Sequence, residues 1–585
     1  MKRAMRMLNG RLDCNNGVRR ASGPAMNDFG LRRQAQRDAA FGPSKKRRRA
    51  ALAAAVQNHA PYLGRFAAWL LCLAAALLPA MAGEVRDVSN RKQLFIDQRF
   101  IASSTHVTLV MNSPRVAGPA LEPGPPGAWD DGKVTWGQVV EDEGIFKMWA
   151  GGISAKTMKQ DWRTLDVSIP LGYATSKDGV HWTKPPLGLI EWEGSKDNNI
   201  CCLDPGYVLI DPKGKPEERY KLLCTAAAEI GAKTIYDALD LHKGGLYFYT
   251  SPDGVHWKWN PNMVFPFHPD TQNQIDYDER LGKYVAYLRA WPNGFLFKKT
   301  YGRAVARVEM DDPMKPWPYD ATAKPVKPWG PKYVATAGKE LPTVMTFPNY
   351  DKEGVWTDVY NPCVSIYPWA EDVYLAFPSM NHYLADSPLP NDSTLNIGMV
   401  TSRDGIQWDW LSTEPYVACG KPGSGRSGQL YEMVGMLKVG DEIFQYHAAS
   451  DLRHNVNWAN ENTLEQLRNV GRVFRTVQRL DGFISADFSK SGGELTTPPL
   501  RFSGNRLELN VNATGGEGKV ELQDAEGRPL QAYEMARCTK IRGADSVRQV
   551  IGWNKRKDLS ALRGQTVRIR FQMRNARLYA FQFRD

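Results

Sequence analysis

The sequence of 585 residues is long enough for two or more domains with separate hydrophobic cores. It contains 18 Trp, 23 Tyr, 51 Gly and 38 Pro, and long amphipathic helical stretches are scarce, which favours an all-β fold. The formal charge of +12 lies at one end, because residues 1–82 hold 15 Lys and Arg against 3 Asp and Glu and the other 503 residues hold 60 of each sign. A neutral main part without a basic, aromatic-interleaved stripe argues against nucleic acid as a partner.

Residues 1–82 are predicted to be a leader that contains a signal peptide. KKRRR precedes the apolar run FAAWLLCLAAALL (66–78), and Ala80 and Ala82 fit the small-x-small pattern of a cleavage site. We therefore expect cleavage after Ala82, secretion to the periplasm or the cell exterior, and no stable membrane association afterwards. The alternative is a membrane anchor, because the apolar stretch 66–82 reaches about 17 residues, the lower limit for a span.

One eight-residue pattern occurs three times in the chain. It reads TSKDGVHW at 175–182, TSPDGVHW at 250–257 and TSRDGIQW at 401–408. A β-prone run precedes each copy, Asp-Gly suits a tight turn, and the Trp that ends each copy can pack on a sheet. Each copy is therefore predicted to be a hairpin between two strands that belongs to the scaffold and not to an active site.

Five pairs of β-like runs joined by polar turns recur with starts spaced 71, 67, 88 and 70 residues apart. They are TWGQVV/FKMWA, GYVLID/YKLLCT, NQIDYD/YVAYLR, NPCVSIYP/VYLAFP and YEMVGML/IFQYHA. One four-stranded sheet cannot bury both faces alone, so five such units predict a five-bladed β-propeller over residues 83–490. Residues 91–104 are expected to add a closing strand or a lead-in.

Residues 491–585 alternate apolar and polar positions without the repeat pattern and are predicted to form a β-sandwich, which either binds sugar or braces the propeller. Helix is expected to be minor, around 455–470. Six cysteines follow the leader without CxxC spacing, which disfavours a zinc site. Export permits a disulfide between Cys201 or Cys202 and Cys224, and buried free thiols are the alternative.

In a propeller, the residues just before the innermost strands line one mouth of the central funnel. The corresponding segments here are WDDGK (129–133), SKDNN (195–199), HPDTQN (268–273), TDVYN (357–361) and GSGRSGQLYE (423–432). Four of them carry an Asp, and the fifth carries Arg426 and Glu432. Carboxylates around one axis repel each other and raise each other's pKa values. Such an arrangement suits glycoside hydrolysis, which needs two carboxylates in different protonation states.

From about Leu94 to Ala486 the chain resembles the five-bladed propeller glycoside hydrolases of families 32, 43, 62, 68 and 117, and most of all uncharacterised secreted bacterial proteins similar to family 32. The repeated hairpins, DTQN at 270–273 and the C-terminal sandwich carry this resemblance. It implies hydrolysis of glycosidic bonds in a poly- or oligosaccharide. The Glu-Cys, Asn-Asp-Pro-Asn-Gly and Arg-Asp-Pro motifs of family 32 are absent, which keeps a non-catalytic carbohydrate-binding or protein-interaction propeller as the alternative.

The resemblance implies three acidic roles, for which the chain offers pairs of candidates. The nucleophile or base would be Asp130 or Asp131, the stabiliser of the oxocarbenium ion Asp197 or Asp270, and the acid Glu432 or Asp358. We expect Asp131, Asp270, Asp358 and Glu432 to converge on one mouth of the funnel. Each has a structural alternative, such as a turn or a cap.

Further candidates would contact the substrate: Trp129, Asp197, Asn273, His382 and Arg426. Trp129 could stack on a sugar ring, although most propeller Trp residues pack between blades. No cofactor is expected to be required. Some members of the resembled families hold a central cation through a His, so His447 is the candidate ligand for a structural Ca²⁺ or other cation in the propeller channel.

Overall fold

A computed structural model of the protein describes residues 84–160, 169–225, 228–229, 245–265, 271–290, 302–317, 341–349, 356–387, 392–454 and 462–585. The chain divides into two units, residues 1–81 and 82–585, and the described residues all belong to the second. Among them strands dominate and the one α-helix is α4 (Ala155–Met158), which confirms the all-β class. No helix in this part of the chain is long and apolar enough to cross a membrane.

Two predictions fall largely outside the described residues. The signal peptide and its cleavage site lie entirely outside the described residues. Residues 455–461 of the helix expected at 455–470 also lie outside them. In the described remainder of that segment, Glu465–Leu467 forms a short 3₁₀ turn.

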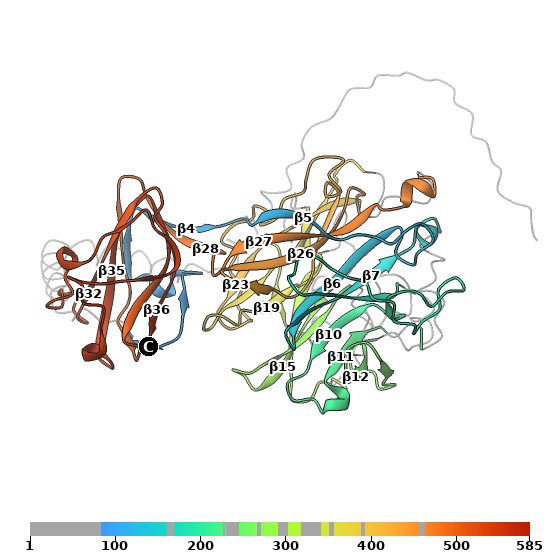
Figure 1. Cartoon of the computed structure of the whole chain (residues 1–585), viewed down its shortest axis with the longest axis horizontal. Helices are drawn as coiled ribbons and strands as arrows, with labels where there is room; N and C mark the ends of the chain where they lie inside the picture. Colours follow the sequence, from blue (N-terminus) through green and yellow to red (C-terminus); the bar gives the residue numbers. More distant parts are fainter. Residues whose placement is uncertain are drawn as a thin grey trace, which may run out of the picture. The chain divides into compact units, whose positions relative to one another are not determined.

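The strands from β6 to β27 form five groups that follow one another along the chain, and we call them repeat units 1 to 5 (Figure 1). Units 1, 2 and 3 each contain four strands in chain order. Their bounds are β6 (Lys133–Asp142), β7 (Ile145–Ile153), β8 (Leu171–Ser176) and β9 (Ile200–Cys202); β10 (Gly206–Ile210), β11 (Tyr220–Cys224), β12 (Tyr247–Ser251) and β13 (Lys258–Trp259); and β14 (Gln274–Asp278), β15 (Lys283–Ala290), β16 (Ala304–Met310) and β17 (Thr343–Met345).

Unit 4 is interrupted, so that it forms two three-stranded sheets in place of one. Pro362 and Pro378 lie at the breaks of its first two strands and have no N–H for a ladder, and Cys363 adopts φ 41°. The two sheets have the orders β18-β21-β22 and β19-β20-β23. Their strands are β18 (Thr357–Val359), β19 (Val364–Ile366), β20 (Tyr374–Ala376), β21 (Ser379–Tyr383), β22 (Ser393–Ile397) and β23 (Val400–Ser402).

Unit 5 contains a strand that precedes unit 1 in the chain. Its own strands are β24 (Gln429–Glu432), β25 (Leu437–Val439), β26 (Glu442–Ser450) and β27 (Gly471–Arg479), and β5 (Arg115–Leu121) pairs antiparallel with β27. A parallel bridge between Gly471 and Lys133 joins this sheet to unit 1. Residues 115–121 thus add a strand to unit 5, whereas residues 93–94 and 103–104 of the segment 91–104, expected as a closing strand or a lead-in, pair with C-terminal strands.

The first strands of the five units contact one another in a cycle. Gln138 of β6 exchanges side-chain hydrogen bonds with the backbone of Val208 in β10, and Tyr207 donates to Asp276 of β14 at 2.5 Å. Gln274 exchanges bonds of 2.7 and 2.8 Å with the backbone of Val364 in β19. The Cys363 thiol lies 3.6 Å from the Met433 carbonyl next to β24, and the Val434 N–H returns to the Gly137 carbonyl of β6 at 3.0 Å.

The repeated hairpins join neighbouring units. Within each, the Ser hydroxyl accepts the Gly N–H at 2.9 Å, and the Asp carboxylate accepts the two following backbone N–H groups at 2.8–2.9 Å. The three Gly carbonyls accept bonds from side chains of another unit, namely Trp149 of unit 1 to Gly254 at 2.7 Å, Tyr287 of unit 3 to Gly405 at 3.0 Å and Tyr446 of unit 5 to Gly179 at 2.5 Å. The predicted scaffold role of the motif therefore fits these contacts.

The remaining strands form two sheets that combine both ends of the described chain, and we call this part the terminal region (Figure 1). Residues 86–111 pair with strands after residue 483, although the prediction placed them with the propeller domain. One sheet contains β1 (Arg86–Ser89), β3 (Ser103–Thr105), β29 (Gly493–Thr496), β30 (Leu500–Phe502), β32 (Glu517–Gln523), β33 (Ile541–Arg542) and β35 (Thr566–Arg574). The other contains β2 (Gln93–Leu94), β4 (Val107–Met111), β28 (Ile484–Phe488), β31 (Arg506–Asn512), β34 (Asp545–Val550) and β36 (Ala576–Arg584).

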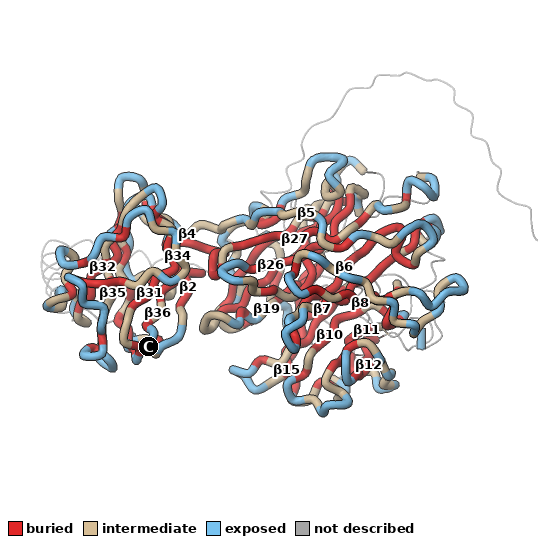
Figure 2. The backbone as a smooth tube through the Cα atoms, viewed as in Figure 1, coloured by how far each residue is buried: buried red, intermediate tan, exposed pale blue. Residues whose placement is uncertain are grey.

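Buried residues follow the strands of both regions, and exposed residues follow the turns (Figure 2). Phe95, Phe571 and Phe581 pack together inside the terminal region, with ring centroids 5.7–6.3 Å from Phe95. No disulfide joins the cysteines of the described residues, and Cys201, Cys202 and Cys224 are buried thiols. These three cysteines therefore agree with the alternative of buried free thiols and not with the disulfide.

Candidate functional site

The segment before β6 is held in place by its own acidic residues. The Asp130 carboxylate is buried and accepts bonds from the Gly124 N–H at 3.1 Å and the Lys184 ammonium at 2.5 Å. The Trp129 indole is buried, donates to the Asn199 side chain at 3.0 Å, and fills the space beside the glycines of β7 and β8. Asp130, predicted as nucleophile or base, and Trp129, predicted to contact the substrate, thus both make structural contacts of the kind given as their alternatives.

Asp131 fixes the start of helix α4. One of its oxygens accepts the Ala155 N–H at 2.7 Å, and the other accepts the Gly127 N–H at 2.9 Å and lies 3.4 Å from the Arg468 guanidinium. It also lines a pocket of about 460 Å³ that contains Arg468 and Arg472. The carboxylate is thus beside a cavity, but each oxygen already has a partner.

The candidates of units 2 and 3 lie in different surroundings. Asp197 is exposed in a turn, where its N–H donates to Ser195. Asn273 is buried, and its side-chain oxygen accepts the Arg289 N–H at 2.9 Å. Asp270 lies outside the described residues. The carboxylate immediately before β10 is Asp204, which is buried and accepts the Tyr249 hydroxyl at 2.8 Å.

Asp358, in the first strand of unit 4, is a fully buried carboxylate with one oxygen in use. Its Oδ2 accepts the Arg303 N–H at 3.0 Å and the Tyr383 hydroxyl at 2.8 Å, and the Arg303 guanidinium lies 3.3 Å away. Its Oδ1 is buried and has no hydrogen-bond partner among the described residues. A buried carboxylate oxygen without a donor is costly, which marks this position as a candidate for binding or chemistry.

Aromatic rings and guanidinium groups surround Tyr360, two residues after Asp358. The Arg289 and Arg303 guanidiniums lie 4.2 and 4.9 Å from the centroid of its half-buried ring. Arg289 also donates to the Tyr360 carbonyl, and His454 lies 3.1 Å from its hydroxyl. The Tyr431 ring of β24 packs at 5.4 Å. We call Arg289, Arg303, Asp358, Tyr360, Tyr383, Tyr431 and His454 the Tyr360 cluster.

Glu432 lies on the other face of β24 from Tyr431, because successive side chains of a strand alternate. Its Oε1 accepts the Gln445 side chain at 3.1 Å, and its Oε2 has no partner in the described part of the chain. Burial raises the pKa of Glu432 well above its usual value, because burial disfavours the charged form. Of the four carboxyls expected to converge, Asp131, Asp358 and Glu432 share no hydrogen-bond partner.

The predicted histidines and Arg426 form two separate contacts. His382 lies 2.9 Å from the Thr357 hydroxyl, and burial lowers its pKa. His447 is fully buried between Phe474, on which it stacks, and Arg426, which donates to its Nε2 at 3.2 Å. Burial and the Arg426 charge lower the pKa of His447 to about 3. A neighbouring guanidinium does not fit a cation site, and the described residues contain no group of three His, Cys, Asp or Glu that could hold a metal.

The structure therefore places one predicted carboxylate, Asp358, in a cluster suited to chemistry. Most other members of the Tyr360 cluster were missed, because the sequence reasoning considered chiefly the starts of first strands. Arg289 stands at the end of the second strand of unit 3, Arg303 directly before its third strand, and Tyr383 at the end of a second strand in unit 4. An Arg or Tyr at such strand ends is the signal that could have found them.

No protein-family model and no curated protein matches the sequence. Several solved structures similar to the chain are described as glycoside hydrolases. A glycosyl hydrolase from Bacteroides ovatus has 14% identity and a TM-score of 0.37 over 67% of this chain and 97% of its own. The catalytic domain of a family 62 α-L-arabinofuranosidase from Coprinopsis cinerea has 11% and 0.34 over 63% and 98%. A family 43 arabinoxylan arabinofuranohydrolase from Bacillus subtilis has 13% and 0.32 over 78% and 96%. TM-scores of this size do not establish a shared fold.

Proposed function

We propose that the chain is a secreted glycoside hydrolase-like protein that acts on a poly- or oligosaccharide at the Tyr360 cluster. The observation that carries the proposal is the buried Asp358, whose Oδ2 is held by Arg303 and Tyr383 and whose Oδ1 has no donor among the described residues. A sugar hydroxyl or an attacking water would supply that donor. Such a carboxylate, fixed in orientation, suits the role of base or nucleophile.

The architecture we propose around this site is a five-bladed β-propeller with a β-sandwich at the C-terminal end. Three features support it: the five successive repeat units, the cycle of contacts between their first strands, and the pairing of β5 with the last unit. In such a propeller, β5 would complete the fifth blade from the other end of the chain. Asp358 and Tyr360 would then lie near the end of a central strand.

The residues of the cluster have complementary roles in this proposal. The Arg303 guanidinium would keep Asp358 ionised and oriented, because an adjacent positive charge favours the carboxylate. The half-buried Tyr360 ring offers an aromatic face next to two guanidinium groups, which can donate to sugar oxygens. Asp130, Asp131, Asp270 and Glu432 stay candidates for the second carboxyl group of the reaction.

A second function, binding of a glycan without turnover, is favoured by one specific observation. The sequence analysis singled out several carboxylates. Among those that the structure describes, only Asp358 belongs to the Tyr360 cluster. Asp130 and Asp131 hold backbone amides, and Glu432 points to the opposite face of β24. One carboxylate among the described residues of the cluster would suffice to bind a sugar, whereas hydrolysis needs a paired acid and base.

A glycan-library assay that measures both released sugar and bound glycan tests the proposal. We expect cleavage by the wild-type protein and a loss of about 100-fold or more in kcat for Asp358→Asn, since general acid–base catalysis typically contributes at least that factor. Asp311→Asn is the matched control, because Asp311 is an exposed carboxylate that was not among the candidate site residues. Binding without released sugar would establish the second function, and full cleavage by Asp358→Asn would refute the site.

Because Asp358 is fully buried beside Arg303, its substitution can destabilise the fold. Tyr383→Phe provides a milder variant, since it removes one hydroxyl donor to Asp358 and leaves the charges in place. We expect a reduced kcat with an almost unchanged melting temperature. An unchanged kcat in this variant together with a fully folded, fully active Asp358→Asn would exclude a role for the cluster.

A further inference from the structure

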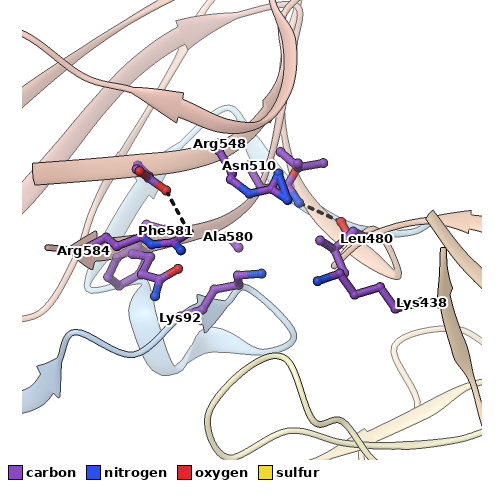
Figure 3. Close-up of a pocket in the computed structure, with 11 residues that line it drawn as sticks. Lys92, Lys438, Leu480, Asn510, Arg548, Ala580, Phe581 and Arg584 are labelled. Atoms are coloured by element: carbon purple, nitrogen blue, oxygen red, sulfur yellow. Dashed lines mark hydrogen bonds and ion pairs between the residues drawn. The ribbon is translucent and has the colours of Figure 1, made fainter. Parts of the chain in front are cut away.

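A pocket of about 180 Å³ that is lined by residues of the terminal region and of unit 5 collects cationic side chains (Figure 3). Its buried floor includes Leu480, Ala580 and Phe581. Its charged lining consists of Lys92, Lys438, Arg548 and Arg584 with one carboxylate, Glu508. The pocket lies apart from the Tyr360 cluster and shares no lining residue with it.

The four cations come from four different strands or their ends. Lys92 directly precedes β2, Lys438 lies in β25, Arg548 lies in β34 and Arg584 ends β36. Like charges that the fold brings to one pocket repel each other, so an anion in the pocket would stabilise the arrangement.

The acceptors around the pocket are already in use. Glu508 lies 2.7 Å from the Arg506 guanidinium and 3.9 Å from that of Arg584. The buried Asp481, which follows the lining residue Leu480 in the chain, receives Lys92 at 2.8 Å and the Tyr367 hydroxyl at 2.8 Å. Each of these two carboxylates therefore already has a cationic partner.

Donors, by contrast, remain. Lys438 makes no hydrogen bond or ion pair with the described residues, although it is only partly exposed. Arg548 uses its two terminal nitrogens on a single oxygen of Asp441, at 3.0 and 2.8 Å. The pocket therefore contains one positive charge, that of Lys438, without a counter-charge among the described residues.

We propose that this pocket binds one oxyanion group, either as a free ion or as the sulfate or phosphate substituent of a carbohydrate. The oxyanion would supply acceptors for Lys438, Lys92 and Arg548, and charge-assisted bonds of this kind are among the strongest that proteins make. A volume of about 180 Å³ equals the share of roughly six waters. It admits a tetrahedral ion but is below the roughly 300 Å³ at which pockets for whole drug-sized ligands begin.

Calorimetric titration of the full-length protein with sodium sulfate, at ionic strength held constant with sodium chloride, tests the proposal. We expect saturable sulfate binding, and affinity about tenfold weaker in Lys438→Gln, which corresponds to about 1.4 kcal/mol. Lys438→Arg should retain binding because it keeps the charge. Lys177→Gln is the matched control, since Lys177 is an exposed lysine in the first repeated hairpin.

Glucose 6-sulfate as a second titrant separates the two sources of the ligand. Tighter binding than sulfate identifies a sulfated sugar as the ligand, and equal affinity identifies the free ion. The proposal is overturned if sulfate gives no saturable heat. It is also overturned if Lys438→Gln binds sulfate as tightly as the wild type and the Lys177→Gln control do. Thermal stability alone is not the readout, because sulfate strengthens apolar burial in any protein. Glycan turnover is not used either, so the result is independent of the proposed function.

Discussion

The repeated hairpins and the Tyr360 cluster differ in how they hydrogen-bond an Asp side chain, which is exposed in the hairpins' Asp253 and fully buried in Asp358. In the second hairpin, Asp253 accepts the Val255 and His256 N–H groups at 2.9 Å and the Ser251 hydroxyl at 3.0 Å. Burial acts to raise the pKa of Asp253, but these hydrogen bonds lower it to about 2. Asp358 has donors on one oxygen only.

The two regions also differ in where their partners come from. Every partner of Asp253 lies within the same hairpin, so the motif is complete in eight residues and can be copied along the chain. Asp358 depends on Arg303, 55 residues away, and on Tyr383, 25 residues away. A local motif with every polar group satisfied is typical of scaffold, and an unsatisfied group assembled from distant segments is typical of a functional site.

The largest effect is expected from breaking the cluster. Arg303→Met would leave the fully buried Asp358 without its guanidinium partner, and removal of one member of a buried ion pair typically costs about 3–5 kcal/mol. We expect a loss of that size in the free energy of unfolding, measured by urea denaturation. The double variant Arg303→Met with Asp358→Leu should recover most of it. A loss below about 1 kcal/mol in the single variant would contradict the comparison.

The hairpins were predictable from sequence because their hydrogen bonds are local. Ser-x-Asp-Gly specifies the turn by itself, and its three copies also indicated the repeat. The pairing of β5 (residues 115–121) with the last unit was not predictable in the same way, because it is set by long-range packing. For the same reason the pairing of residues 86–111 with the C-terminal strands escaped the sequence analysis.

A second, smaller effect concerns pH. The pKa of His447 is lowered to about 3 in the folded protein, so the unfolded chain binds a proton at this residue below about pH 6.5 while the folded protein does not. Stability from the neutral His447 is therefore present above pH 6.5 and is lost as pH falls towards 3. Between pH 6.5 and 5 the loss should reach about 2 kcal/mol, at 1.36 kcal/mol per pH unit.

The measurement compares the free energy of unfolding of the wild type and His447→Gln at both pH values. Other groups titrate in both proteins, so the difference between their slopes isolates His447. Equal slopes would mean that His447 gains a proton in the folded state, which the Arg426 guanidinium next to its Nε2 opposes.

The candidate site was predictable only in part, because long-range packing, which local sequence does not specify, brings its residues together. Asp358 was found because it stands in a first strand, where radial repetition gives every unit an equivalent position. Asp131 occupies such a position too, yet it caps the start of α4, a role that depends on the local loop and not on the repeat. Arg303, which holds the Asp358 carboxylate, belongs to unit 3, and no pattern within unit 4 indicates it.

The smallest effect should come from the hairpins, where one bond among many is removed. Ser251→Ala deprives the buried Gly254 N–H of its acceptor at 2.9 Å, and an unmet hydrogen bond of this kind costs about 1–3 kcal/mol. We expect the lower end of that range, about 1 kcal/mol, in urea unfolding, because the Asp253 carboxylate still holds the rest of the turn. Ser195→Ala is the matched control, since Ser195 also accepts one backbone N–H but in an exposed turn, where water replaces it. Glycan turnover or binding should stay at the wild-type level in both variants. A loss of turnover in Ser251→Ala with stability intact would mean that the hairpin takes part in the site, and the division between scaffold and cluster would then fail.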